Sequence, residues 1–207
     1  MSRSQEDNAG PQAVLDFWFG DGLALGWPSS PRGALWFGGG AALDADIRGR
    51  FGALVTQAVD GGLTGWEAEV RDRLALVILL DQFTRNVFRG EARAFAGDAR
   101  AHRLATDTLA RGEDALLPLV GRVFIAMPLM HAEDGASQAG CVRHFEQLRA
   151  SCAPAQAEAL QGHLDAAIEH QTLITTYGRF PHRNAVLGRT SSPQERAYLE
   201  NGRRFGQ

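Results

Sequence analysis

The sequence predicts an all-α fold, and three observations carry that prediction. Apolar residues recur at helical spacing in segment after segment of the 207-residue chain. Two capping boxes, Thr64 with Glu67 and Ser192 with Glu195, mark helix starts. No segment shows the sustained period-two alternation of a half-buried strand. We therefore expect a disordered tail over residues 1–10 and a single helical domain over residues 11–207, built as an irregular array of packed antiparallel helices.

The first half of the chain predicts three helices separated by glycine-rich connections. One spans residues 11–19 and has Pro11 in its first turn. After an aromatic loop over residues 20–40, apolar spacing predicts a helix over residues 43–59. The box at Thr64 should open the next helix, in which the pairs Glu67/Arg71 and Glu69/Arg73 support an exposed first half.

The second half predicts five further helices. Asp98 is the expected N-cap of a helix that runs to Arg111. Residues 116–130 are apolar apart from one arginine, and Pro128 should kink or end that helix. Residues 135–150 form an amphipathic helix, and Pro154 opens another that ends near Tyr177. Its apolar face should consist of Leu160, Leu164, Ala167, Ile168, Gln171 and Ile174. The box at Ser192 opens a last short helix that ends near residues 201–202.

Composition limits the function classes. The net charge of −3 and the pI near 6.1 give no electrostatic footprint for nucleic acid or an anionic membrane, so we expect neither partner. Every basic residue is arginine. The absence of lysine excludes a Schiff base, a lysine nucleophile and a P-loop, but planar recognition of carboxylate or phosphate remains available.

Cysteine usage and the first residues point to the cytoplasm. Cys141 and Cys152 do not lie in a metal-ligand spacing, and the opening MSRSQEDNAG lacks the apolar region of a secretory signal. We expect both cysteines to be free thiols that only pack against their neighbours.

The stretch Leu74–Gly90 passes directly from an apolar run into a polar one. Residues 74–80 have no polar face at any helical phase, which is typical of a buried helix. Beyond them, helical spacing stacks Asp81, Arg85 and Arg89 on one row, with Gln82 and Asn86 on the adjoining row. Charges at the inner end of a buried helix must be paired or engage a ligand.

Two further stretches carry polar residues that we group with this set. The break at Pro128 brings His131, Glu133 and Asp134 to the end of a second apolar helix. The loop between the last two predicted helices holds Arg179, His182, Arg183 and Asn184.

The arginines favour an anionic ligand. Arg85, Arg89, Arg179 and Arg183 offer many donors to a phosphate or carboxylate, and Asn86, Asn184 and His182 add to them. Asp81, Glu133 and Asp134 could instead neutralise these arginines internally, which would make the cluster purely structural.

Acid–base chemistry is the other use of this set. His131 and His182, with Asp81, are the candidate catalytic residues, because imidazoles beside a carboxylate can transfer protons near neutral pH. The two histidines could equally be hydrogen-bonding core residues. The spacing of His131, Glu133 and Asp134 matches no established metalloenzyme motif, and arginines oppose cations, so we expect no metal and no cofactor.

Four stretches, taken together, resemble a known family. They are VLDFWFG (Val14–Gly20), LLDQFTRNVFRG (Leu79–Gly90), MPLMHAED (Met127–Asp134) and GRFPHRNAVLGR (Gly178–Arg189). In this order they are similar to the motifs of a bacterial domain-of-unknown-function family, number nine-two-four. The resemblance implies an all-helical, tetratricopeptide-repeat-like fold with no established activity, although we find no regular repeat of that type. The family's marked positions correspond to Asp81, Gln82, Arg85, Asn86, Arg89, His131, Glu133, Asp134, His182, Arg183 and Asn184. One departure is Thr84, where the family commonly has proline and hence a break in the helix.

Two function classes follow from the sequence. The first is an enzyme or binding protein that holds a small anionic molecule in a polar pocket, and we favour it because the polar residues follow buried helices. The second is an interaction module that grips an acidic or C-terminal carboxylate peptide in a helical groove.

Overall fold

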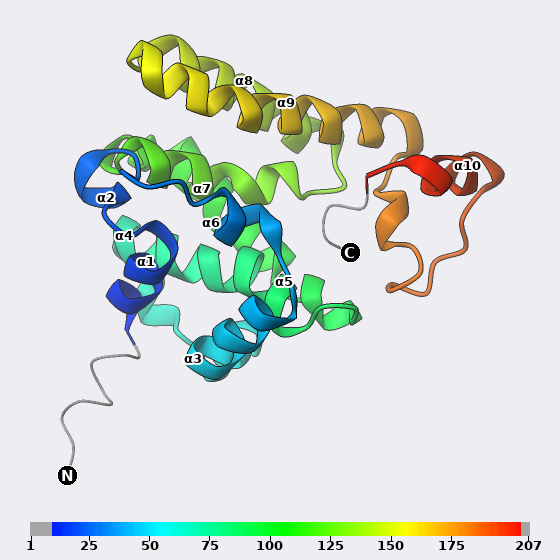
Figure 1. Ribbon diagram of the computed structural model, residues 1–207, viewed down its shortest axis with the longest axis horizontal. Helices are drawn as coiled ribbons and strands as arrows, with labels where there is room; N and C mark the ends of the chain where they lie inside the picture. The colour runs from blue at the N-terminus through cyan, green and yellow to red at the C-terminus, as the bar shows by residue number, and fades with distance from the viewer. Residues whose placement is uncertain (1–9, 204–207) are drawn as a thin grey trace. The chain divides into compact units, whose positions relative to one another are not determined.

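The computed structural model describes residues 10–203, and its helices confirm the all-α class. Within this range the chain has no strand. The predicted tail over residues 1–10 lies, apart from Gly10, outside the described residues. The α-helices, drawn in Figure 1, are α1 (Pro11–Phe19), α2 (Gly22–Leu25), α3 (Ala41–Val59), α4 (Val70–Val77), α5 (Thr84–Val87), α6 (Asp98–Ala110), α7 (Leu119–Met130), α8 (Gly135–Ser151), α9 (Pro154–Tyr177) and α10 (Pro193–Asn201).

The chain divides into two compact units. Unit 1 contains the described residues through Arg89 together with Arg93–Pro128, and unit 2 contains Gly90–Ala92 and the described residues from Leu129 onward. The single domain over residues 11–207 stays a prediction, because a division of contacts does not test independent folding. The likeness to tetratricopeptide repeats also stays a prediction.

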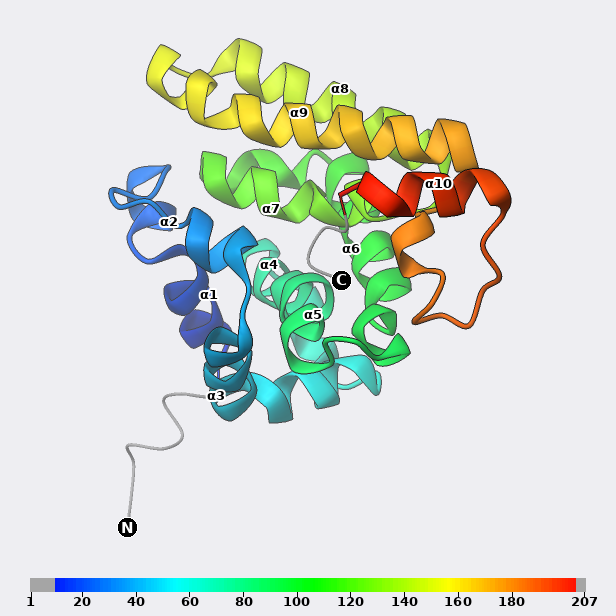
Figure 2. The same ribbon diagram turned by 45° about the vertical axis from the view of Figure 1, so that its right-hand side comes forward.

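Unit 1 is organised around α4, whose apolar run is buried as predicted. Every residue from Leu74 to Leu80 is fully buried. The helices α1 and α6 pack against α4, and α3 packs against α5 (Figure 2). Edge-to-face contacts join the rings of Trp18, Phe83 and Phe124 in the same core.

A π-helical turn, η3 (Ile78–Phe83), connects α4 to α5 at the point where the apolar run becomes polar. The N–H of Thr84 donates to the carbonyl of Leu79, five residues earlier, and its hydroxyl donates to the Leu80 carbonyl at 2.8 Å. The helix therefore widens by one residue but does not break, consistent with threonine rather than proline at this position.

The predicted capping box at Thr64 does not form. Thr64–Glu67 is a 3₁₀ turn, η2, that follows Leu63 in the left-handed conformation (φ 56°). The Glu67 carboxylate instead accepts hydrogen bonds from Arg100 and Arg103, at 2.7 Å and 3.0 Å. The helix α4 begins only at Val70.

Arg73 is buried, although the sequence places it in an exposed first half of the helix. Its side chain is 6% exposed and donates to the Thr108 hydroxyl at 3.0 Å and to the carbonyls of Glu67 and Ala68. It also forms an ion pair with Glu113. These partners replace the predicted pair with Glu69.

Asp98 is the first residue of α6 rather than its N-cap, which is Gly97. A Cβ at Gly97 would lie 2.3 Å from the Leu80 carbonyl oxygen, so only glycine allows α6 to begin this close to the π turn. The side chain of Asp98 is thereby free of a capping role and turns to other partners.

Unit 2 is built on the hairpin of α8 and α9, which lie side by side in Figures 1 and 2. The Asp134 carboxylate caps α8 by accepting the Ser137 N–H at 2.8 Å. Four residues of the predicted apolar face of α9 are buried: Leu160, Leu164, Ala167 and Ile174. The prediction was wrong for Ile168, which is 45% exposed, and it left out His163 and His170, which are buried.

The end of α7 is held by a side chain from α8. The amide nitrogen of Gln138 donates to the carbonyls of Met130 and Ala132, at 2.6 Å and 2.8 Å. Since Gln138 is fully buried, these bonds fix the turn that carries His131 and Glu133.

The capping box at Ser192 forms as predicted. The Ser192 hydroxyl accepts the Glu195 N–H at 3.1 Å, and the Glu195 carboxylate accepts the Ser192 N–H at 2.6 Å.

Cys141 and Cys152 are free thiols, as predicted. In the part of the chain that the structure describes, no helix combines the length and the apolar character needed to cross a membrane.

Candidate functional site

The polar residues that follow α4 in unit 1 are taken up by carboxylates. Asp81 is fully buried and accepts a hydrogen bond from the side-chain amide of Gln82. The guanidinium of Arg85 lies 3.5 Å from the Asp81 carboxylate and 3.0 Å from that of Asp98. The row predicted from helical spacing therefore forms its first pair, and Asp98 from α6 adds a second carboxylate.

Asp44, in the first turn of α3, binds the rest of this set. Arg89 donates to both carboxylate oxygens, at 2.6 Å and 2.9 Å, and Asn86 donates to one of them at 2.9 Å. The hydrogen bonds from Arg89 hold the pKa of the Asp44 carboxyl below its ordinary value, although burial opposes them. Arg89 therefore forms a bidentate ion pair with a buried carboxylate of its own unit.

Asp44 and Asp98 were missed, although the sequence carried a signal for both. Each lies on the apolar face of its helix: Asp44 precedes Ile47 by three residues, and Asp98 precedes Ala101 by three. An acidic residue on an apolar face needs a buried partner. With these two included, Arg85 and Arg89 of unit 1 have carboxylate partners in Asp44, Asp81 and Asp98.

In unit 2, two bidentate ion pairs hold the loop between α9 and α10. Arg189 donates to both oxygens of Glu133, at 2.6 Å and 2.9 Å, and Arg179 donates to both oxygens of Glu195, at 2.6 Å and 2.8 Å. Glu133 also accepts the N–H of Phe180 at 2.8 Å, and Arg189 donates to the carbonyl of Phe180. The backbone at Phe180 is therefore fixed from both sides.

The ring of Phe180 is the centre of a compact group of side chains, which we call the Phe180 cluster: His131, His170, Phe180, His182 and Arg183. The Phe180 ring is fully buried, and the Arg183 guanidinium lies 4.6 Å from its centroid. The rings of His170 and His182 each have their centroid 5.4 Å from it. The ring of His131 lies 6.1 Å from that of His170.

Burial and mutual repulsion keep two of these imidazoles neutral. Burial lowers the pKa of His170 to about 3, and the nearby His131 contributes. The pKa of His182 is also lowered to about 3, first by burial and then by the charge of Arg183. At neutral pH each ring therefore offers one donor and one acceptor, beside a permanent cation.

The remaining predicted residues of unit 2 have local roles. Asp134 is exposed and caps α8, and its carboxylate also accepts the Ser137 hydroxyl at 2.6 Å. Asn184 is 1% exposed and donates to the Ser191 hydroxyl at 3.1 Å. Among residues 10–203, no three His, Cys, Asp or Glu side chains are arranged to hold a metal ion.

The predicted set is thus divided between the two units. Unit 1 holds Asp81, Gln82, Arg85, Asn86 and Arg89, and unit 2 holds His131, Glu133, Asp134, Arg179, His182, Arg183 and Asn184. Sequence reasoning missed His170, although its position seven residues after His163 on the buried face of α9 was a usable signal. It also missed the role of Arg189, because no local pattern specifies a pair across 56 residues.

Comparisons with known proteins give a family without a known activity. The family model described as bacterial protein of unknown function (DUF924) matches residues 14–203. The chain is also similar to the solved structure of a protein of unknown function from Agrobacterium tumefaciens, with 35% identity and a TM-score of 0.73. That similarity covers 93% of this chain and 97% of the other. No curated protein matches.

Proposed function

We propose that this chain, which belongs to the DUF924 family of bacterial proteins of unknown function, binds a small anionic molecule at the Phe180 cluster of unit 2. The observation that carries the proposal is the arrangement of two imidazoles and the Arg183 guanidinium around one buried ring, with the third imidazole, His131, beside His170. The carboxylate that lies among them, Glu133, is already held by Arg189. A carboxylate or phosphate ligand could accept hydrogen bonds from the imidazoles and the guanidinium of this group.

The surroundings favour a preformed site. The two bidentate pairs fix the backbone on either side of Phe180, so His182 and Arg183 are held by a rigid loop. Preorganised donors lose little entropy when a ligand binds. Burial strengthens each charge-assisted hydrogen bond that an anion would accept there.

The proposal gives the predicted residues different roles. Arg183 would bind the anion, and His131 and His182 would orient it and exchange a proton with it if the protein is an enzyme. Glu133 and Arg179 hold the loop. We give no direct role to the unit 1 residues, since Asp81, Gln82, Arg85, Asn86 and Arg89 are engaged with one another and with Asp44 and Asp98.

A purely structural network is the second candidate, and the unit 1 set supports it for its own residues. There each guanidinium has a buried or half-buried carboxylate partner, as expected of charges that stabilise the packing of helices.

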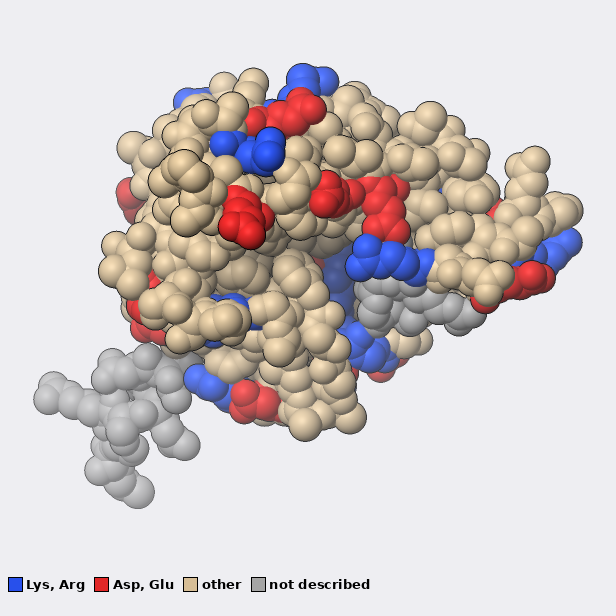
Figure 3. All heavy atoms as spheres, turned by 45° about the horizontal axis from the view of Figure 1, so that its top comes forward, with Lys and Arg blue, Asp and Glu red and all other residues tan. Residues whose placement is uncertain are grey.

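We also propose that the protein works in the cytoplasm, in line with its two free thiols. Most of the face in Figure 3 carries neither acidic nor basic side chains, and several of the acidic side chains lie beside basic ones.

Sulfate is a suitable probe, because it remains a dianion throughout the useful pH range. At about a hundredfold excess over its Kd, sulfate should stabilise the wild type by roughly 2.7 kcal/mol, measured as a rise in melting temperature against sodium chloride of equal ionic strength. Arg183→Ala should remove this effect. Arg149→Ala changes an exposed arginine of α8 and should keep it.

The outcome separates the two candidates. A sulfate effect that disappears only with Arg183 supports the anion site. Equal sulfate responses in the wild type and Arg183→Ala, or no response in either, would leave the Phe180 cluster as a structural network.

A further inference from the structure

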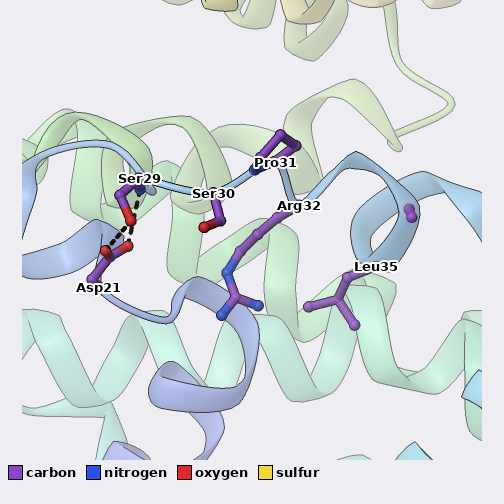
Figure 4. A pocket seen from close by; sticks show the side chains of 7 residues that line it. Asp21, Ser29, Ser30, Pro31, Arg32 and Leu35 are labelled. Atoms are coloured by element: carbon purple, nitrogen blue, oxygen red, sulfur yellow. Dashed lines mark hydrogen bonds between the residues drawn. The ribbon is translucent and has the colours of Figure 1, made fainter.

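Unit 1 contains a pocket that is unconnected with the residues considered so far. It has a volume of about 570 Å³, within the range of roughly 300–1,000 Å³ that small-molecule sites occupy. Its walls come from the N-cap residue of α2, from the loop that follows α2 and from the π-helical turn η1 (Ala34–Gly38): Asp21, Ser29, Ser30, Pro31, Arg32, Ala34 and Leu35 (Figure 4).

The guanidinium of Arg32 is held in place on one side of this pocket. It donates to the carbonyl of Phe17 at 3.1 Å, at the C-terminal end of α1. A Cβ at Gly20 would lie 2.2 Å from a terminal nitrogen of Arg32, so the absence of a side chain there gives the guanidinium its place. Gly20 also has a positive φ of 57°, a backbone conformation that favours glycine. Both its conformation and its contact with Arg32 therefore favour glycine at this position.

Asp21 is held on the other side. Its carboxylate accepts the N–H of Ser29 at 3.0 Å and also the Ser29 hydroxyl. These hydrogen bonds, with a smaller contribution from the charge of Arg32, lower the pKa of the Asp21 carboxyl below its ordinary value. Two bonds still leave acceptor capacity on a carboxylate, which has about four lone-pair sites.

The two opposite charges share the pocket without joining. Within residues 10–203, neither Asp21 nor Arg32 forms an ion pair, although the charge of Arg32 acts on Asp21. In the view of Figure 4, Ser30 lies between Asp21 and Arg32. A fixed anion and a fixed cation that face one cavity but do not touch leave room for a ligand of the complementary charges.

We propose that this pocket binds a small zwitterion, a free amino acid or a very short peptide, with its ammonium group at Asp21 and its carboxylate at Arg32. Ser30 would donate a hydrogen bond to the ligand carboxylate. The inference is independent of anion binding at the Phe180 cluster, because it uses other residues in the other unit.

The other walls indicate which zwitterions fit best. Pro31, Ala34 and Leu35 give the pocket an apolar side, which suits an aliphatic side chain. The volume exceeds that of a single amino acid, so a dipeptide has room. A ligand with one charge only would meet one like charge in the pocket, and it should bind more weakly for that reason.

Calorimetric titration with four related compounds tests the charge pattern. L-Leucine and L-leucylglycine carry both charges, L-leucinamide keeps only the ammonium, and N-acetyl-L-leucine keeps only the carboxylate. We expect at least one of the two zwitterions to bind about tenfold or more tightly than either blocked compound. Equal affinity for the zwitterions and the blocked compounds, or no binding of any of them, would overturn the proposal.

Variants locate the binding. Asp21→Asn should weaken the zwitterion by about tenfold, and Ala34→Trp, at an exposed wall residue, should block the pocket without touching the core. Asp16→Asn is the matched control, since Asp16 is an exposed carboxylate near the same end of α1. Zwitterion binding that survives both Asp21→Asn and Ala34→Trp would place the ligand elsewhere and refute this site.

Discussion

The same dipeptide, arginine followed by asparagine, occurs in both units and has a different environment in each. In unit 1, Arg85 pairs with Asp81 and Asp98, and Asn86 binds Asp44. In unit 2, Arg183 stacks on Phe180 among three histidines, and Asn184 bonds the Ser191 hydroxyl and the Glu195 carboxylate. The local sequence does not decide between these environments. They differ because of what the rest of each unit supplies.

The difference lies in where the carboxylates go. Helices α3 and α6 bring Asp44 and Asp98 to the arginines of unit 1, so that each arginine of that set is paired with a carboxylate. In unit 2 the carboxylates of Glu133 and Glu195 are bound by Arg189 and Arg179. Arginines that are all paired with carboxylates are expected where charges only stabilise the packing of helices. A group of hydrogen-bond donors around a buried ring is expected of a binding site.

The largest expected effect is the contrast between the two arginines. Arg85→Ala leaves the fully buried Asp81 without its cation and should cost roughly 3–5 kcal/mol of unfolding free energy. Arg183→Ala loses a stack on Phe180 and an attraction to Glu133 but relieves the repulsion that disfavours charged His182, so it should change stability by less than about 1 kcal/mol. Urea denaturation measures both free energies of unfolding. Equal losses in the two variants would mean that Arg85 and Arg183 do not differ in structural role.

The next effect tests whether Asp44 closes the unit 1 set. Asp44→Ala removes the acceptor of Arg89 and Asn86 and should cost about 3 kcal/mol. Asp46→Ala is a matched control on the same helix, because Asp46 is half exposed and lies 3.8 Å from Arg50. That surface pair should contribute less than about 0.5 kcal/mol. Similar losses for the two variants would show that Asp44 is not a buried partner.

The fold was largely predictable from the sequence because helical periodicity is local. The two capping boxes show where this fails. Both have the right residues, but only Ser192 precedes a helix, whereas Thr64 follows a left-handed Leu63 and its partner Glu67 binds Arg100. A local motif competes with distant charged groups, and the sequence does not show which of them will be near.

The candidate site was less predictable than the fold for the same reason. The motifs correctly marked Arg85 and Arg183 as unusual, but both arginines were assigned to one anionic site. Separating them requires knowing that Asp98 reaches Arg85 across 13 residues and that Arg189 takes Glu133 across 56. Pairs at such separations depend on the packing of whole helices.

Acid should destabilise the protein through the buried histidines before it acts on the paired carboxylates. The pKa of His170 in the folded protein is about 3, against about 6.5 when unfolded, so the unfolded state binds the proton first. Stability is therefore full above about pH 6.5 and falls by up to about 1.4 kcal/mol per pH unit for this residue as the pH drops towards 3. His163, with a pKa of about 4, and His182, with a pKa of about 3, act in the same direction.

Urea denaturation at about pH 6.5 and about pH 5.5 measures this loss, and His170→Gln should reduce it by about 1 kcal/mol. Ile168→Ala changes an exposed residue of the same helix without a titrating group, so it should keep the full pH dependence. The carboxyl of Glu195, whose pKa is lowered to about 2 by Arg179, loses its contribution only below about pH 4.5. An unchanged pH dependence in His170→Gln would mean that folding does not lower the pKa of this imidazole.

The smallest expected effect concerns one hydroxyl at the π turn of unit 1. Thr84 and Thr172 each donate to the carbonyl four residues earlier at 2.8 Å, but Thr84 is fully buried and Thr172 is exposed. Thr84→Val keeps the side-chain shape and leaves the Leu80 carbonyl short of a donor away from water, so it should cost about 1 kcal/mol. Thr172→Val leaves a carbonyl that water can reach, and its cost should be less than about 0.5 kcal/mol. If the two changes cost the same, the Leu80 carbonyl has another donor, and the hydroxyl of Thr84 is not what holds the turn that presents Asp81 and Arg85.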